Sequence, residues 1–561
     1  MSSRPLPFGF LALCAVLSLA PFLRANEPSP TRELRDLNKS YFPFTPVKSK
    51  DAWDIRREEV KRRVLVASGL WPMPEKTPLN AVIHGRIERD EYTVEKVFFE
   101  SLPGHFVCGN LYLPKQKPAQ MPGILCPHGH WPNGRFMVAA DAEVTKQITM
   151  GAESIENAAR SPLQARCVQL ARMGCTVFFY DMLGYADSVQ FCDAEGKVLH
   201  RHGPQARGFL STEAEQQLVG YFPLQTWNSV RALDFITSLP GVDATRIGCT
   251  GASGGGTQTM VLSGIDERIA AAFPCVMVST AMQGGCTCEN TNHLRIGLGN
   301  IDIAALTAPR PLGMTAADDW TKELETKGFP DLKSLYTMLG VPDRVEAHYN
   351  IQFPHNYNAV SRSQMYAFYN QHFKLGRSDA QLQERGFTFS PPEELTVWNA
   401  QHPKPSGENV GTPHEVAVVA WFKEQTSRQL APLLAPKTVD AVAQQREVLG
   451  GAWGILLAAK LPGQDGATFA LGPKEDRGRY FVLRGSINGP QHALDGTFLY
   501  PKDWNGTTVV WTSLKGEAAL LHGNGDLTAT AEKLLAERFA IACPKLYLLD
   551  AVKNPNVYAN G

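Results

Sequence analysis

Apolar and polar positions alternate along the chain with two different periods, one typical of strands and one typical of helices. A period of two at residues 92–99 and 106–113 predicts two strands, with Pro103-Gly104 as the turn between them. A continuous apolar run of strand length follows at residues 176–180, and further strands are predicted at residues 123–127, 246–250, 270–278, 310–315 and 345–349. Amphipathic helical patterns lie at residues 164–173, 224–238, 257–264 and 362–374. Buried strands that alternate with helices predict a mostly parallel sheet, covered by helices on both faces, over residues 91–376.

The first 90 residues carry a targeting signal and an arm. Arg4 precedes an apolar run over residues 8–23, Ala25 closes it, and a polar, Pro-rich stretch follows. This pattern predicts a cleavable signal peptide over residues 1–25, and so a secreted or periplasmic protein without stable membrane association; an uncleaved anchor is the alternative. The rest, residues 26–90, is predicted as an N-terminal arm with one amphipathic helix.

A Pro-rich linker is predicted over residues 377–415, and a second region over residues 416–561. Helical patterns lie near residues 416–434, 438–449 and 523–539, and strand patterns near 480–484, 507–512 and 540–549. The last strand, helix and strand resemble the opening unit of a further α/β domain. We expect an incomplete α/β domain without a nucleophile, or the end of a truncated chain.

Composition narrows the possible functions. The 561 residues are 43% hydrophobic, which is enough for a large core. The 55 Lys and Arg residues balance the 55 Asp and Glu residues, and no basic stripe is present, so nucleic acid is not an expected partner.

The 11 cysteines lack the density of a disulfide scaffold, so buried thiols or one or two disulfides are expected. Cys286 and Cys288 are predicted to lie too close in sequence to bridge each other easily, so either would need a distant partner. A zinc site is not favoured, because only His293 lies near them in sequence. No metal or organic cofactor is predicted.

The strongest chemical signal lies between a predicted strand and a predicted helix. Residues 251–255 read Gly-Ala-Ser-Gly-Gly, a G-x-S-x-G sequence centred on Ser253. In a strand-to-helix turn, this sequence holds the serine in a strained conformation above the strand ends. A Gly-rich turn without chemistry is the alternative. The strand–turn–helix context favours a nucleophile, and with it an α/β-hydrolase fold for residues 91–376.

A serine nucleophile needs a histidine base and a carboxylate that orients it, and in this fold both follow the serine along the chain. His355 follows the last predicted strand and is predicted to be the base, whereas its competitor His348 lies within that strand. Asp319 is predicted to be the acid. Asp318 is the alternative, because the sequence does not show which neighbouring side chain faces the histidine, while Asp302 is expected to be structural.

Two backbone amides are predicted to bind the oxyanion. Gly254 follows the nucleophile, and His130 closes a His-Gly-His loop after an early strand. Trp131, Tyr185 and Trp320 lie in strand-end loops and are candidate substrate-binding residues, with burial in the core as the alternative.

Two long polar stretches, residues 131–162 and 188–222, are predicted as loops that build the substrate pocket. Asp181 lies in another strand-end loop, where a structural hydrogen bond to backbone is expected.

Six short stretches within residues 50–376 carry a family resemblance. They are Tyr92-Thr-Val-Glu-Lys-Val, Cys126-Pro-His-Gly-His, Gly251-Ala-Ser-Gly-Gly-Gly-Thr-Gln-Thr, Cys288-Glu-Asn, Ala308-Pro-Arg-Pro-Leu and Pro354-His-Asn-Tyr-Asn. Together they resemble the bacterial α/β-hydrolase family called acetyl xylan esterase, related to dienelactone-hydrolase-like and prolyl-oligopeptidase-like hydrolases. The resemblance implies Ser253, Asp319 and His355 as the triad, and an O-acetylated plant or algal polysaccharide as the substrate class. Longer relatives carry a second hydrolase-like unit, which the C-terminal region resembles in part.

The sequence therefore predicts a secreted serine carboxylester hydrolase that removes acetyl groups from a polysaccharide or oligosaccharide such as xylan. A prolyl-oligopeptidase-like peptidase is less favoured, because the first 90 residues are too few for a propeller. A glucuronoyl esterase is less favoured because that family places Arg after the serine, where this chain has Gly254. A non-catalytic carbohydrate-binding protein on a hydrolase scaffold would require the triad order to be accidental.

Overall fold

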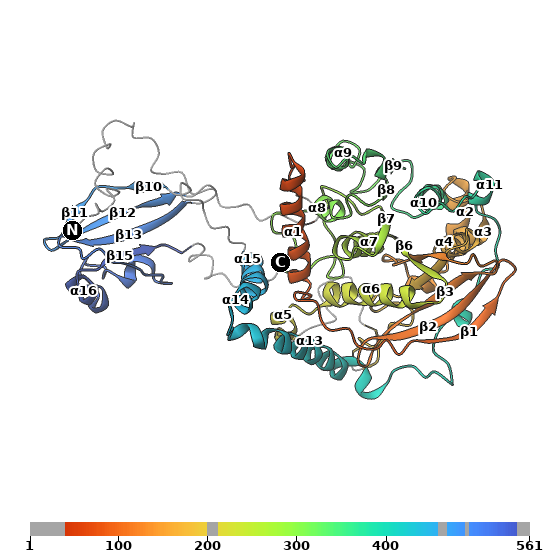
Figure 1. The fold of residues 1–561 in the computed structure, drawn as a ribbon, viewed down its shortest axis with the longest axis horizontal. Coiled ribbons are helices and arrows are strands. Elements are labelled where there is room, and N and C mark those ends of the chain that lie inside the picture. Colours follow the sequence, from red (N-terminus) through yellow and green to blue (C-terminus); the bar gives the residue numbers. More distant parts are fainter. Residues whose placement is uncertain are drawn as a thin grey trace. The chain divides into compact units, whose positions relative to one another are not determined.

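The computed structural model describes residues 37, 40–193, 195–198, 211–457, 468–488 and 493–546. The chain folds as two units, one comprising residues 35–459 and the other including residues 460–561 (Figure 1). The predicted signal peptide and part of the predicted arm lie outside the described residues. No helix in the described part of the chain is long and apolar enough to cross a bilayer.

The larger unit is built on a nine-stranded sheet in the order β1-β2-β3-β5-β4-β6-β7-β8-β9 (Figure 1). The strands are β1 (Val82–Glu88), β2 (Tyr92–Leu102), β3 (His105–Pro114), β4 (Met121–Leu125), β5 (Thr176–Tyr180), β6 (Val242–Ala252), β7 (Ile269–Cys275), β8 (Leu312–Ala316) and β9 (Val345–Tyr349). The pairs β1–β2, β2–β3 and β3–β5 are antiparallel. The pairs from β5–β4 onward to β8–β9 in the sheet order are parallel. The predicted mostly parallel sheet is confirmed, and β1 is an edge strand formed by residues of the predicted N-terminal arm.

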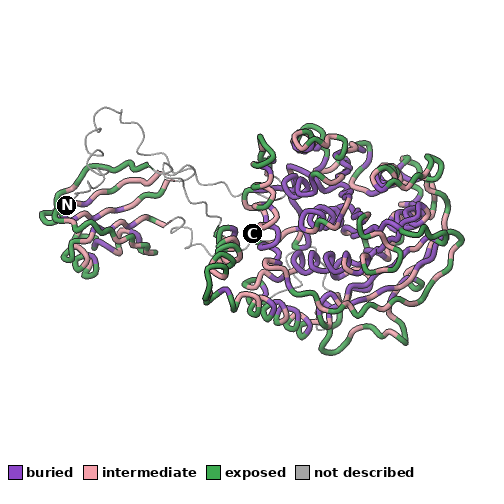
Figure 2. Tube along the Cα trace, viewed as in Figure 1, coloured by how far each residue is buried: buried purple, intermediate pink, exposed green. Residues whose placement is uncertain are grey.

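Helices cover both faces of this sheet. They are α1 (Lys50–Ala67), α6 (Tyr221–Ser238), α7 (Gly254–Ile265), α8 (Asn300–Ala305) and α9 (Phe329–Met338) in one core cluster, and α4 (Pro162–Arg172) and α10 (Ala359–His372) in the other. Along β5, Phe178 and Tyr180 join the first cluster, whereas Val177 and Phe179 join the second. Because successive strand residues point to opposite faces, the clusters lie on the two sides of the sheet. Figure 2 shows that buried residues are concentrated in the central elements of this unit.

The helices begin where local chemistry favours a start. Ser49 caps α1 by accepting a hydrogen bond from Ala52 N, and Ser161, directly before Pro162, caps α4. Asn358 accepts from Ser361 N at the start of α10. This last cap ends the loop after β9, which carries His355.

The two long stretches predicted as loops contain helices. The first holds α2 (Asp141–Thr149) and α3 (Glu156–Arg160), and the second holds α5 (Thr212–Gln216). Asp141 and Glu143 in the first turn of α2 interact favourably with the helix N-terminus, and Val144 buries its side chain. Short amphipathic helices of this kind give little periodic signal in the sequence.

Three helices within or at the start of the predicted C-terminal region lie in the larger unit, and the sequence predicted the first two of them. They are α13 (Gly411–Leu434), α14 (Val439–Gln445) and α15 (Gly451–Leu456). Val418, Val419 and Phe422 of α13 are part of the first core cluster, so apolar burial binds this helix to the sheet unit.

The smaller unit has a sheet of its own in the order β10-β12-β13-β15-β14, with β11 paired to β12. Its elements are β10 (Thr468–Leu471), β11 (Glu475–Asp476), β12 (Tyr480–Asn488), β13 (Ala493–Pro501), β14 (Thr508–Val510), α16 (Ala529–Ala536) and β15 (Ala540–Pro544). β14 and β15 are parallel and α16 lies between them in sequence, which is the predicted strand–helix–strand unit. The other pairs are antiparallel, and this partial α/β unit buries a small core of its own.

Candidate active site

Ser253 occupies the sharp turn between β6 and α7. Its φ of 57° and ψ of −127° place a residue with a side chain in the strained region that favours glycine. Ser253 N donates to Cys275 O on β7 (3.2 Å), and Ser253 O accepts from Thr257 N in α7 (2.9 Å), so both neighbours hold the strained conformation. This is the backbone geometry of a nucleophile elbow.

Glycines allow the loop after β4 to lie directly against this turn. A side chain at Gly255 would come within 2.6 Å of Pro127 O. One at Gly129 would come within 2.7 Å of Ser253 Cβ. These contacts are too close for any Cβ, so the His-Gly-His loop reaches the nucleophile only because these residues have no side chain.

His355 and Asp319 form a pair between two neighbouring loops, in which the Asp319 side chain is buried and the His355 side chain is partly exposed. His355 Nδ1 lies 2.7 Å from Asp319 Oδ2, and Asp319 Oδ1 accepts from the amide (2.6 Å) and hydroxyl (2.5 Å) of Thr321. Asp318 instead has a side chain 67% exposed and lies 3.7 Å from Lys322. Of the two predicted aspartates, the structure brings Asp319 to the histidine.

The three predicted triad residues follow three strands of one parallel block. Ser253 follows β6, Asp319 follows β8 and His355 follows β9. Since β6, β7, β8 and β9 are parallel neighbours, these loops leave the same carboxyl edge of the sheet. This edge is where α/β folds bind their ligands.

Two tryptophans flank the histidine of the pair. The Trp131 ring stacks on His355 with centroids 6.4 Å apart, and the Trp320 ring centroid lies 4.6 Å from the same imidazole. Trp131 also contacts the space where a Gly129 side chain would lie. Trp131 therefore extends from the serine turn to His355.

Tyr185, the third predicted substrate-binding aromatic residue, belongs to a network of contacts between the loops after β4 and β5. Tyr185 meets the ring of His128 edge-on at 5.2 Å, and His128 Nε2 accepts from Met182 N (3.1 Å). Asp181 accepts two hydrogen bonds from the buried Arg135 (2.8 and 2.9 Å). Burial raises the pKa of Asp181 above its ordinary value, although Arg135 lowers it. These contacts hold the loops after β4 and β5 together.

The two competing residues are engaged elsewhere. His348 lies within β9, with Nε2 3.2 Å from Glu346 Oε1. Asp302 caps α8 by accepting from Gly299 N (3.0 Å) and pairs with Arg56 (2.8 Å).

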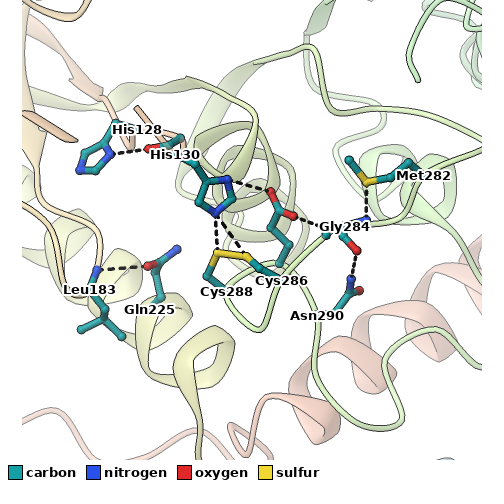
Figure 3. The surroundings of a disulfide bond; sticks show 12 residues. His128, His130, Leu183, Gln225, Met282, Gly284, Cys286, Cys288 and Asn290 are labelled. Carbon is teal, nitrogen blue, oxygen red and sulfur yellow. Dashed lines mark hydrogen bonds and ion pairs between the residues drawn. A yellow bond between two sulfur atoms is a disulfide. The ribbon is translucent and has the colours of Figure 1, made fainter. Parts of the chain in front are cut away.

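The imidazole of His130 lies beside the serine turn and against two cysteines. A Cβ at Gly254 would lie 3.3 Å from His130 Cε1 and 3.5 Å from Glu289 Oε1. His130 Nδ1 is 3.8 Å from Glu289 Oε1, and its Nε2 is 2.9 Å from Cys288 Sγ and 3.2 Å from Cys286 Sγ (Figure 3). From the sequence, only the backbone amide of His130 was predicted to take part in catalysis, and Glu289 was missed although it lies in the Cys288-Glu-Asn stretch.

Cys286 and Cys288 form a disulfide, so the prediction that they could not easily bridge each other is wrong. Their Cα atoms are 5.4 Å apart, within the usual range of about 4.4–6.8 Å for bridged cysteines. The loop bends enough that Glu289 N and Asn290 N both donate to Cys286 O (3.1 Å each). The other described cysteines are unpaired thiols, as expected for most of them, and all but Cys192 are buried.

Comparison with protein families bears on this site. The family model described as acetyl xylan esterase (AXE1) matches residues 156–282, a segment that contains Ser253 and the strand before it. The predicted family resemblance is confirmed. No curated protein matches the chain.

Comparison with solved structures bears on the fold. Methylesterase BT1017 is 26% identical with a TM-score of 0.53, over 68% of this chain and 78% of that chain. A glucuronoyl esterase from Solibacter usitatus is 17% identical with a TM-score of 0.42, over 59% of this chain and 95% of that one. An acetyl xylan esterase from Paenibacillus sp. R4 is 16% identical with a TM-score of 0.36, over 59% and 97%. The first of these confirms the α/β-hydrolase fold.

Proposed function

We propose that the chain is a serine carboxylester hydrolase that acts on an esterified carbohydrate. The observation that carries this proposal is the 2.7 Å contact of His355 with Asp319, at the same sheet edge as the strained Ser253. In this arrangement the carboxylate holds the imidazole in the tautomer whose Nε2 accepts a proton from serine. The acetyl xylan esterase model supports it, because the matched segment contains the serine turn.

The proposed reaction is acyl transfer to serine and then to water. His355 takes the proton of Ser253 as the hydroxyl oxygen attacks the ester carbonyl. The amides of Gly254 and His130 bind the oxyanion, aided by the N-terminus of the 12-residue α7. The alcohol leaves with the proton from His355, and water hydrolyses the acyl-enzyme by the same route. The proposal requires no metal or organic cofactor.

Removal of acetyl groups from a polysaccharide or oligosaccharide such as xylan is the leading substrate class. Trp131 and Trp320 flank His355 and offer ring faces on which a sugar can stack. Cleavage of methyl esters is a second candidate, favoured by the likeness to Methylesterase BT1017. In an acetyl ester the sugar is the alcohol, whereas in a methyl ester of a uronate the sugar is the acyl part. A secreted or periplasmic location suits a polymeric substrate and belongs to this proposal.

Paired variants test the mechanism. Ser253→Ala should lower the turnover of p-nitrophenyl acetate by roughly four to six orders of magnitude, because the nucleophile is removed. Ser363→Ala, exposed on α10, is the matched control. His355→Gln should be nearly as damaging, and His348→Gln should not. Near-normal turnover by Ser253→Ala would overturn the proposal, and an inactive wild-type chain would favour a binding protein.

A substrate panel tests the bond. Acetate release from acetylated xylan would support the leading class, and methanol release from a methyl-esterified polyuronate would support the second. A glucuronoyl ester and a proline-containing peptide complete the panel. Preferential cleavage of the peptide would contradict an esterase function.

A further inference from the structure

Three metal-binding side chains come together beside the serine turn. His130 Nε2, Cys286 Sγ and Cys288 Sγ all lie within 4.8 Å of one another (Figure 3). Cys288 is fully buried, and the His130 side chain is only 16% exposed. An imidazole nitrogen with two sulfurs is a donor set that favours Zn²⁺ and other thiophilic ions.

We propose that reduction of the Cys286–Cys288 disulfide converts this cluster into a binding site for one Zn²⁺ ion. The disulfide form cannot bind the ion in this way, because the thiolate and not the disulfide sulfur is the metal ligand. The site would thus exist only in the dithiol state of the chain. It does not depend on the proposed ester hydrolysis, since none of its ligand atoms belongs to Ser253, Asp319 or His355.

The positions of the donors fit a tetrahedral ion after a small movement. Zn–S bonds of about 2.3 Å and Zn–N bonds of about 2.0 Å place neighbouring ligand atoms roughly 3.5 Å apart. His130 Nε2 is already 2.9 and 3.2 Å from the two sulfurs. Once the sulfurs separate on reduction, the imidazole needs to withdraw by only about 0.5 Å. Three protein ligands leave the fourth position for water.

The second nitrogen of His130 faces a fixed carboxylate. Nδ1 lies 3.8 Å from Glu289 Oε1, while Glu289 Oε2 accepts from Gly285 N (2.6 Å). A carboxylate behind a ligating histidine fixes the tautomer that presents Nε2 to the metal and raises its basicity. Glu289 is 2% exposed, so bulk water does not replace this interaction.

The loop that carries the cysteines has hydrogen bonds besides the disulfide. Asn290 Nδ2 donates to Gly284 O (2.9 Å), and Arg295 Nε donates to Asn290 Oδ1 (2.8 Å). Asn290 N also donates to Cys286 O (3.1 Å). These bonds are unaffected by reduction, so the two thiols should stay close to His130.

The conversion has two balanced steps. A dithiol reductant supplies two electrons and two protons to the disulfide, which becomes two thiols while the reductant becomes a disulfide. Binding of Zn²⁺ to the two sulfurs and His130 Nε2 then releases two protons, because both cysteines bind as thiolates.

The test uses the full chain without a histidine tag, with Ser253→Ala to silence hydrolysis. Reduced, desalted protein is titrated anaerobically with Co²⁺ and then with Zn²⁺. We expect one ion per chain and a thiolate-to-cobalt charge-transfer absorption that Zn²⁺ abolishes. The oxidised protein should show neither signal.

Variants identify the ligands. Cys286→Ser should remove most of the charge-transfer absorption, and His130→Gln should weaken Zn²⁺ binding at least tenfold. Glu289→Gln should weaken it by about 10–100-fold, the usual cost of losing a partner behind a ligand. Cys192→Ser is the matched control, because Cys192 is a partly exposed thiol outside the cluster and its loss should change nothing.

Several outcomes would overturn the site. They are a reduced chain that binds no ion, binding that survives Cys286→Ser, equal binding by the oxidised chain, and loss of the native circular dichroism spectrum on reduction. An esterase that hydrolyses normally but fails these tests would leave the proposed function intact.

Discussion

At the scale of single residues, the site depends on which of two adjacent aspartates meets His355. Asp319→Asn should lower turnover of p-nitrophenyl acetate by roughly 10⁴, because an amide no longer fixes the productive tautomer of the imidazole. Asp318→Asn should stay within about twofold of wild type, since that side chain is 67% exposed and forms a surface ion pair with Lys322. Steady-state kinetics of both variants decide between them, and equal losses would contradict the assignment.

A second residue-scale prediction concerns the close approach at Gly129. Gly129→Ala should destabilise the fold by about 1–3 kcal/mol and lower kcat/KM, because the added methyl group would meet Ser253 Cβ and Ala252 O. Gly386→Ala is the control, since a Cβ at that position has open space around it. Urea denaturation and ester kinetics measure the two effects. An unchanged Gly129→Ala enzyme would show that the two loops separate easily.

These residues also mark how far sequence reasoning reached. Ser253 and His355 could be proposed because a strand–turn–helix pattern and chain order are local properties. The choice between Asp318 and Asp319 could not be made, because it depends on side-chain direction in a loop. The pairing of Cys286 with Cys288 was misjudged because loop curvature is set by hydrogen bonds such as Asn290 N to Cys286 O. The contact of His130 with Cys286 joins residues 156 apart, beyond any local pattern.

At the scale of elements, Arg135 ties three segments together. It binds Asp181 after β5 (2.8 Å), Asp187 in the same loop (2.7 Å) and Leu395 O in the segment after α10 (3.1 Å). Arg135→Met should cost about 3–5 kcal/mol of unfolding free energy, because two buried carboxylates lose their cation. Arg385→Met, which breaks a half-exposed pair, should cost less than about 1 kcal/mol. Similar losses in chemical denaturation would contradict this account.

The attachment of α13 should depend on pH. His414 of α13 lies 3.0 Å from His105 at the start of β3, and both are buried. Burial lowers the pKa of His414 to about 4 and lowers that of His105 well below its usual range. At His414 the unfolded chain therefore binds a proton below about pH 6.5, whereas the folded chain does so only near pH 4, and stability should fall as the pH falls through this window.

The measurement is the unfolding free energy at pH 7 and pH 5. His414 alone should account for a loss of about 2 kcal/mol between these values. His414→Gln should remove that part of the loss, whereas His348→Gln, at a side chain one-third exposed, should leave most of it. An unchanged pH dependence in His414→Gln would show that this pair does not control the acid sensitivity.

Elements with a long apolar pattern were predictable, and short or edge elements were not. β5 matches the predicted range 176–180, because a fully buried strand is apolar at nearly every position. β9 matches the predicted range 345–349, although it includes the partly buried polar residues Glu346 and His348. β1 was missed because its burial alternates between partly covered and exposed residues. α13 was recognised as a helix but assigned to the wrong unit, since the attachment of a helix depends on tertiary burial of residues such as Phe422.

At the scale of the whole molecule, the two units have separate cores. The core of the smaller unit consists of residues within 480–543, none of which belongs to the clusters around the larger sheet. All residues proposed for catalysis lie between Gly129 and His355, inside the larger unit.

A chain ending at residue 457 should therefore keep kcat/KM for p-nitrophenyl acetate within about threefold of the full chain, because a folded domain with its own core can fold alone. A matched chain ending at residue 410 should lose α13, expose the pocket occupied by Phe422, and unfold at lower temperature than both. Calorimetry and ester kinetics on the three chains test this. Loss of activity on removal of residues 458–561 alone would show that the smaller unit contributes to the site or to its stability.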